Sequence, residues 1–150
     1  MATSAPAGTR RSRAGRALVA ASGVALSVVP WLVDVNRHHT FGPGWGPHAR
    51  LHGTAGVLTS TGEGALVTAL ALRPGQPLGV AAALPALHWF AFNLAALVPT
   101  TSVDEVDHPV PRLAGRFPVN LVAQNVLGLV AVAGWCLHRW GTRAAAGKAR

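Results

Sequence analysis

Four long apolar runs dominate this chain of 150 residues and limit what it can fold into. They cover residues 17–33, 51–72, 77–98 and 119–137, and each is close to the roughly 20 residues that a helix needs to cross a bilayer core about 30 Å thick. Only 12% of the residues are charged, about half the fraction found in a typical soluble protein. The sequence therefore predicts an all-α fold, a four-helix transmembrane bundle.

The length of the chain allows one domain. We expect a single membrane domain over residues 17–138, and a basic tail at each end: a disordered one at 1–16 and a second one at 139–150. The spans within the membrane domain are expected at about 17–35, 50–72, 77–98 and 119–138.

The sequence disfavours two alternatives to a bundle of four membrane spans, namely a soluble helical bundle and a first run that is a cleaved signal peptide. A soluble four-helix bundle would carry polar stripes at the helical period, and the apolar runs lack them. The first run has the basic leader of a secretory signal, but no convincing small-x-small cleavage site precedes its end at Asp34. We therefore expect the first run to remain as a span.

The net charge of +8 is concentrated at the ends of the apolar runs. A nucleic-acid-binding protein would instead present a basic face on a folded element, so we expect no nucleic-acid partner. Nine Lys and Arg residues fall on the side of the termini and four on the other side. Because these residues are enriched in cytoplasmic loops, both termini are predicted to be cytoplasmic.

Composition bears on the compartment and on cysteine chemistry. The abundance of Ala, Gly, Val and Arg, with a single Lys and no Tyr, is typical of GC-rich bacterial genomes and favours the plasma membrane of a bacterium. Cys136 is the only cysteine, so the chain can form neither an internal disulfide nor a thiolate metal site of its own.

Small residues recur at every fourth position in the first two spans. Such stripes allow helix backbones to approach closely in lipid, where close packing is a main driver of association. The predicted contact stripes are Ala17, Ala21 and Ala25 in the first span, and Gly56, Ser60, Gly64 and Thr68 in the second.

Two ionisable residues lie near the middle of neighbouring spans. A charged carboxylate at mid-bilayer costs about 2.5–3.5 kcal/mol on insertion scales, so Glu63 should face the bundle and have a partner. The tight turn at 73–76 makes the second and third spans antiparallel neighbours and brings His88 to the same depth. We expect Glu63 and His88 to pair, as a structural contact or as a catalytic acid–base pair.

Further polar residues fall near the loops 34–50 and 99–118. Both loops are expected on the outer side of the membrane. These polar residues therefore predict a cavity that opens to the outer side and binds a small or lipid-like molecule. Its expected lining is Asn36, Trp45, Asn93, Gln124 and Asn125, with Asn120 nearby. The alternative is that these amides form helix–helix hydrogen bonds of modest strength.

The segment 34–52, DVNRHHTFGPGWGPHARLH, holds four of the seven histidines. Its last two, His48 and His52, are four residues apart and would share one face of a helix. Histidine and carboxylate ligands suit Zn²⁺ and other divalent transition metals. The candidate metal ligands are Asp34, His39, His48 and His52, to which Asp104, Asp107 or His108 could add a ligand from the other loop. The alternative is an interfacial loop with Trp45 at headgroup level and Asp34 or Asn36 as a cap.

The loop also carries a long motif, D-x-N-x-x-H-x-F-x-P-x-W-x-P-H-A-R-x-H. It is formed by Asp34, Asn36, His39, Phe41, Pro43, Trp45, Pro47, His48, Ala49, Arg50 and His52. This motif resembles the signature of a family of small four-span membrane proteins from bacteria and fungi, classed as a domain of unknown function. The resemblance implies the four-span architecture and marks the loop as the site, but it implies no activity. The family usually has Asn at the position of Gly42, often Pro at Gly46, and more often Thr at His38.

The leading functional hypothesis is a membrane protein that binds a small molecule or a metal ion through this loop, at the outer face of the membrane. The alternatives are an enzyme that acts on a lipid-, sterol- or quinone-like substrate through Glu63 and His88, and a structural accessory subunit. The expected partners are membrane lipids and a small lipophilic ligand, and no oligomeric state is predicted.

Overall fold

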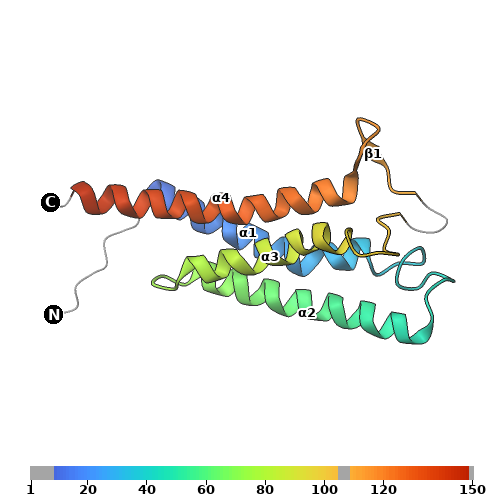
Figure 1. Cartoon of the computed structure of the whole chain (residues 1–150). Helices are drawn as coiled ribbons and strands as arrows, with labels where there is room; N and C mark the ends of the chain where they lie inside the picture. Colours follow the sequence, from blue (N-terminus) through green and yellow to red (C-terminus); the bar gives the residue numbers. More distant parts are fainter. Residues whose placement is uncertain (1–8, 105–108, 149–150) are drawn as a thin grey trace.

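The computed structural model describes residues 9–104 and 109–148, which form four helices and one small hairpin (Figure 1). The helices are α1 (Arg10–Val33), α2 (Pro47–Leu72), α3 (Leu78–Ala95) and α4 (Val119–Lys148). The antiparallel strands β1 (Arg112–Leu113) and β2 (Phe117–Pro118) lie between α3 and α4. Apart from this hairpin, the described residues confirm the predicted all-helical fold.

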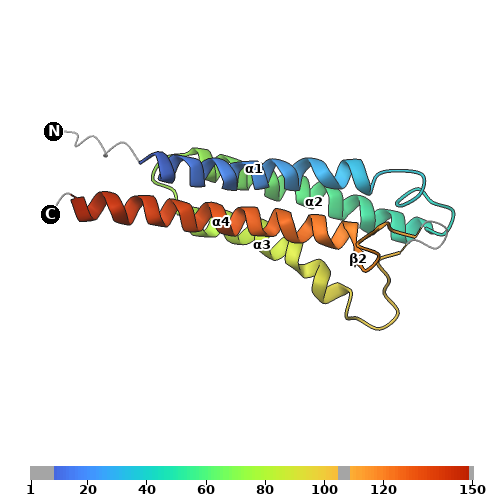
Figure 2. The same cartoon turned by 90° about the horizontal axis from the view of Figure 1, so that it is seen from above.

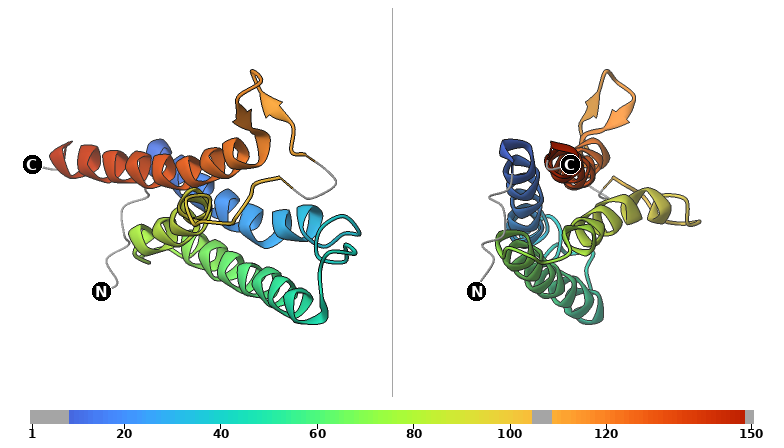
Figure 3. Two further views of the ribbon diagram at one scale, coloured as in Figure 1. Left: turned by 45° about the vertical axis from the view of Figure 1, so that its right-hand side comes forward. Right: turned by 90° about the vertical axis from the view of Figure 1, so that its left-hand side faces the viewer.

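The helices alternate in direction, so α1 begins and α4 ends at the same end of the bundle (Figure 2). We call this the termini end, and the opposite end, with residues 34–46, 96–104 and 109–118, the loop end. Helix α1 packs extensively against both α2 and α4, and α3 packs mainly against α4. Helices α2 and α3 diverge from the turn at 73–77 toward the loop end (Figure 3).

All four helices are long and apolar enough to cross a membrane. At most 33% of each apolar window is buried inside the bundle. The outward surface instead carries large aliphatic side chains in mid-helix, such as Leu58, Leu87 and Leu129. A soluble bundle would expose polar side chains there, so this surface is compatible with a multi-pass membrane protein.

Two helices extend beyond the predicted spans. Residues 10–16, expected to be part of a disordered tail, form the first turns of α1, and α4 continues through residues 139–148; residues 1–8 and 149–150 lie outside the described part. The Thr9 hydroxyl oxygen accepts a hydrogen bond from the Ser12 backbone N–H and caps α1. The Ser12 hydroxyl also lies 2.9 Å from His138 Nδ1, so the extension of α1 contacts α4 at the end of the predicted fourth span.

Arg16 joins α1 to the end of α2. Its guanidinium donates hydrogen bonds to the backbone carbonyls of Leu70 and Arg73. The Leu70 carbonyl belongs to the last turn of α2 and Arg73 is its C-cap, and at a helix C-terminus the carbonyls lack intrahelical donors and a positive charge is favoured.

Glycines set the close approach of α1 to its two neighbours. A Cβ atom at Gly64 would overlap the Gly23 carbonyl and lie 2.6 Å from the Ser27 backbone nitrogen. Gly15 and Gly134 make a similar contact between α1 and α4. The predicted stripe on α2 is confirmed at Ser60 and Gly64, which are buried, and is wrong at Gly56, which is exposed. The predicted alanine stripe on α1 is wrong, because the buried face runs through Gly15, Val19, Gly23 and Leu26 instead.

The contact at Gly64 yields a prediction. We expect Gly64→Ala to lower the free energy of unfolding by about 1–3 kcal/mol, because the added methyl group forces α1 and α2 apart. The matched control is Gly62→Ala on the same helix, where a Cβ meets no atom within 4 Å. The control should be neutral or slightly stabilising, since Ala favours helix by up to about 1 kcal/mol. Denaturation of the detergent-solubilised variants measures both, and equal effects would contradict the packing described.

Candidate functional site

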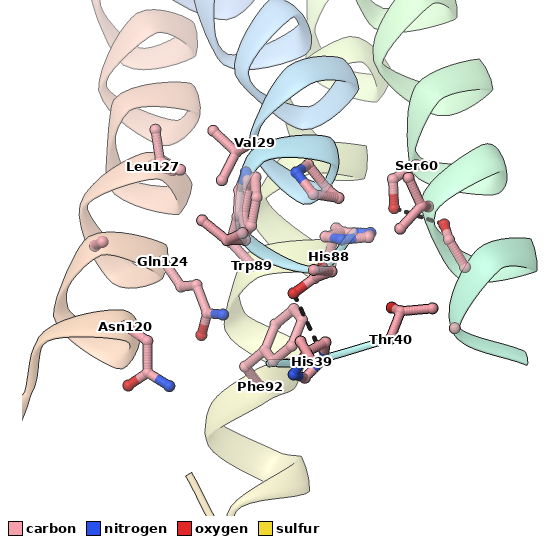
Figure 4. A pocket seen from close by; sticks show the side chains of 17 residues that line it. Val29, His39, Thr40, Ser60, His88, Trp89, Phe92, Asn120, Gln124 and Leu127 are labelled. Atoms are coloured by element: carbon pink, nitrogen blue, oxygen red, sulfur yellow. Dashed lines mark hydrogen bonds and ion pairs between the residues drawn. The ribbon is translucent and has the colours of Figure 1, made fainter. Parts of the chain in front are cut away.

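A cavity of about 260 Å³ lies in the loop-end half of the bundle (Figure 4). It is lined by all four helices and by the segment that follows α1. Most of the wall is apolar, with contributions from Val29, Val57, Phe92 and Leu127. A largely apolar cavity with a few polar groups is the usual form of a small-molecule site.

Three side chains of this wall carry a buried polar atom with no hydrogen-bond partner among the described residues. They are the Thr40 hydroxyl oxygen, the Trp89 indole nitrogen and the Gln124 side-chain oxygen. Thr40 is 0% and Trp89 2% exposed, so solvent outside the bundle does not reach them. The three residues come from the first loop, α3 and α4 and surround one space (Figure 4). Because unsatisfied buried polar atoms are rare and costly, this cluster indicates a place where a polar group binds.

Glu63 and His88 contact each other across the gap between α2 and α3. The Glu63 Oε2 atom lies 3.3 Å from His88 Nδ1, and the side chains are 37% and 24% exposed. The predicted contact is therefore present, while its acid–base role stays a prediction. His88 also lines the cavity, so Glu63 contacts a ring nitrogen of a histidine in the cavity wall.

A second carboxylate–histidine pair lines the same cavity. The Asp34 Oδ1 atom lies 3.7 Å from His39 Nε2. Asn36 shapes the turn between them, because its side-chain oxygen accepts hydrogen bonds from the backbone N–H groups of His38 and His39. This Asx-type turn brings His39 back over the end of α1. Asn36 is thus a turn residue, as in the alternative interpretation of the loop, and does not line the cavity.

His48 and His52 form a separate pair on the exposed first turns of α2. Their Nε2 atoms are 3.2 Å apart, and neither residue lines the cavity. Among the described residues, no three His, Cys, Asp or Glu side chains gather as a group that could hold a metal ion. The four predicted metal ligands therefore divide into two pairs in the structure, because Asp34 and His39 turn inward and His48 and His52 face outward.

The remaining predicted cavity residues have mixed positions. Gln124 lines the cavity, whereas Asn93 and Asn125 are paired with each other by two reciprocal amide hydrogen bonds of 3.0 and 2.9 Å between α3 and α4. Trp45 packs against the His39 ring, with 4.8 Å between centroids, and does not line the cavity. Asn93 and Asn125 thus act as helix–helix contacts.

The second loop contributes one described candidate. Asp104 binds Arg112 at 2.6 Å and accepts a hydrogen bond from the Val110 backbone N–H, so its carboxylate holds this loop together. Asp107 and His108 lie outside the described residues.

Sequence reasoning missed Thr40 and Trp89. Thr40 stands in a loop of polar residues, and nothing in its type or spacing distinguishes it from its neighbours. Trp89 follows His88 directly and so lies about 100° further around the helix, and helical spacing alone gave no reason to place both on one wall.

Comparison of the chain with protein-family models, with curated proteins and with solved structures finds no match. Membership of the four-span family that the loop motif resembles therefore stays a prediction.

Substitution of the unpartnered amide of Gln124 and of the paired amide of Asn125 should change the free energy of unfolding in opposite directions. We expect Gln124→Met to raise the free energy of unfolding by up to about 1 kcal/mol, because it removes a buried atom without a partner. Asn125→Leu should lower it by about 1–2 kcal/mol, because it breaks the reciprocal amide pair. Thermal unfolding in detergent tests both, and a destabilised Gln124→Met would show that this side chain is already satisfied.

Proposed function

We propose that this chain is a multi-pass protein of a cell membrane, here a bacterial plasma membrane with both termini cytoplasmic, that binds a small amphipathic molecule in the loop-end cavity. The observation that carries the proposal is that three side chains with an unpartnered buried polar atom, Thr40, Trp89 and Gln124, line the same apolar-walled cavity. Burying polar atoms without partners is unfavourable, and a bound polar group relieves that cost.

The hydrogen-bonding capacity of the wall restricts the ligand. The Trp89 indole N–H can only donate, and the Gln124 side-chain oxygen can only accept. A hydroxyl group can accept a hydrogen bond from the indole or donate one to the amide oxygen, whereas a ketone or an ether can only accept. The aliphatic wall accommodates a hydrocarbon portion. We therefore assign the ligand to the lipophilic alcohols. The volume of about 260 Å³ lies just below the range usual for drug-sized ligands, and so suits a head group with a short apolar part.

This ligand class can be tested with 1-octanol as the probe, and with octane and octyl methyl ether for comparison. At about ten times its dissociation constant, 1-octanol should stabilise the protein by about 1.4 kcal/mol and raise the melting temperature by about 3–5 °C. Neither comparison compound should do so, and Gln124→Met should abolish the shift. The control Thr59→Val alters an exposed hydroxyl on α2 and should keep it. Equal shifts with all three compounds, or an unchanged response of Gln124→Met, would contradict the proposal.

A second candidate function is acid–base catalysis on the bound molecule. It is supported by the two carboxylate–histidine pairs, because His39 and His88 both line the cavity and each has a carboxylate on one ring nitrogen. A carboxylate in this position orients the imidazole and stabilises its protonated form during proton transfer. In this reading Glu63 and His88 form the catalytic pair, with His88 at the substrate and Glu63 behind it.

Glu63→Gln separates catalysis from binding. The amide preserves the size of the side chain but cannot stabilise a protonated His88, so turnover should fall by about 10²–10⁴-fold while binding changes little. The substrate for this assay is the molecule that copurifies with the protein, identified by native mass spectrometry. The control His38→Gln changes an exposed histidine of the loop. A folded Glu63→Gln variant with full turnover would exclude the acid–base role, and an unfolded variant would make the pair structural.

A further inference from the structure

We propose that His48 and His52 form a two-histidine chelate for a divalent transition metal ion at the loop-end surface, separate from the cavity. The Nε2 atoms of the two rings face each other at 3.2 Å. The rings meet edge to face, with 4.6 Å between their centroids. This arrangement places two imidazole nitrogens side by side at the surface of α2.

The separation of the two nitrogens matches the requirement of a metal ion. Zinc binds histidine nitrogen at about 2.0–2.1 Å and prefers tetrahedral geometry. Two nitrogens at these bond lengths and at a tetrahedral angle are about 3.3 Å apart. The observed 3.2 Å therefore already meets the nitrogen–nitrogen distance of such a chelate, and rotation of the two rings would direct both nitrogens at one ion. A metal ion would replace the contact that the two rings now make with each other.

The backbone holds the pair in place. Both residues lie in the first two turns of α2, and Pro47 occupies its first position, where the fixed backbone angle of proline favours the start of a helix. Residues four apart on a helix lie one above the other on the same face. Both side chains are exposed, so water can supply the remaining ligands.

The chemistry of the pair determines which ions it takes. Neutral imidazoles bind Cu²⁺, Ni²⁺ and Zn²⁺, whereas Mg²⁺ and Ca²⁺ prefer oxygen ligands. Copper should bind most tightly, in accordance with the usual order of these metals. The start of a helix is the positive end of its dipole, which disfavours a cation. With two protein ligands and this dipole, affinity should be moderate.

The test is calorimetric titration of the full chain in detergent, purified without a histidine tag, with Cu²⁺, Ni²⁺, Zn²⁺ and Mg²⁺. We expect one equivalent of Cu²⁺, Ni²⁺ or Zn²⁺ to bind, and no Mg²⁺. His48→Ala and His52→Ala should each weaken binding at least about tenfold, because loss of a second-shell partner alone commonly costs that much. The control His38→Ala changes another exposed histidine near the same end and should bind normally.

Three results would overturn the proposal. The first is no saturable binding by the wild-type chain, and the second is unchanged binding by folded His48→Ala and His52→Ala variants. The third is an equal loss of binding in Asp34→Asn or His39→Ala, which would restore the four-residue site expected from the sequence. The response to 1-octanol should persist in His48→Ala, so failure of the metal site can be distinguished from failure of the cavity.

Discussion

The approach of α1 to two neighbours at once is the contact on which the rest of this bundle depends. Gly23 against Gly64 brings α1 onto α2, and Gly15 against Gly134 brings it onto α4. In lipid, where exclusion of water contributes little between helices, such close packing is a main source of association. Both flanks of α1 are thereby occupied, so α3 attaches mainly to α4 and meets α2 only loosely. The gap between α2 and α3, with the cavity at its loop end, follows from this arrangement.

The Glu63–His88 contact shows what could be predicted from the sequence. Glu63 lies nine residues before the end of α2 and His88 ten residues after the start of α3, so a tight turn between two straight helices fixes their depth. The position of a residue along a helix follows from counting residues, and the predicted contact between Glu63 and His88 is confirmed. The contact stripe on α1 failed because several stripes of small residues run along that helix, and their spacing does not tell which one faces the core.

The sequence could not determine which of the four predicted metal ligands lie together, because spacing orders residues along a helix but not around a loop. Spacing of four residues correctly paired His48 with His52, since both stand on one helix. Asp34 and His39 are joined to that helix by a loop, and the direction in which a loop side chain points depends on its turns. Here the hydrogen bonds of Asn36 fold the chain so that His39 returns over the end of α1. Neither this turn nor the burial of Thr40 leaves a periodic signal in the sequence.

The unpartnered atoms of Thr40, Trp89 and Gln124 bear on how much of this protein a cell retains. A molecule that satisfies these atoms binds the folded chain and not the unfolded one, and so shifts the folding equilibrium toward the native bundle. In cells, a change of 1–2 kcal/mol is enough to alter steady-state abundance several-fold through quality-control proteolysis. The amount of this protein in its membrane would then follow the supply of its ligand, even where transcription is constant.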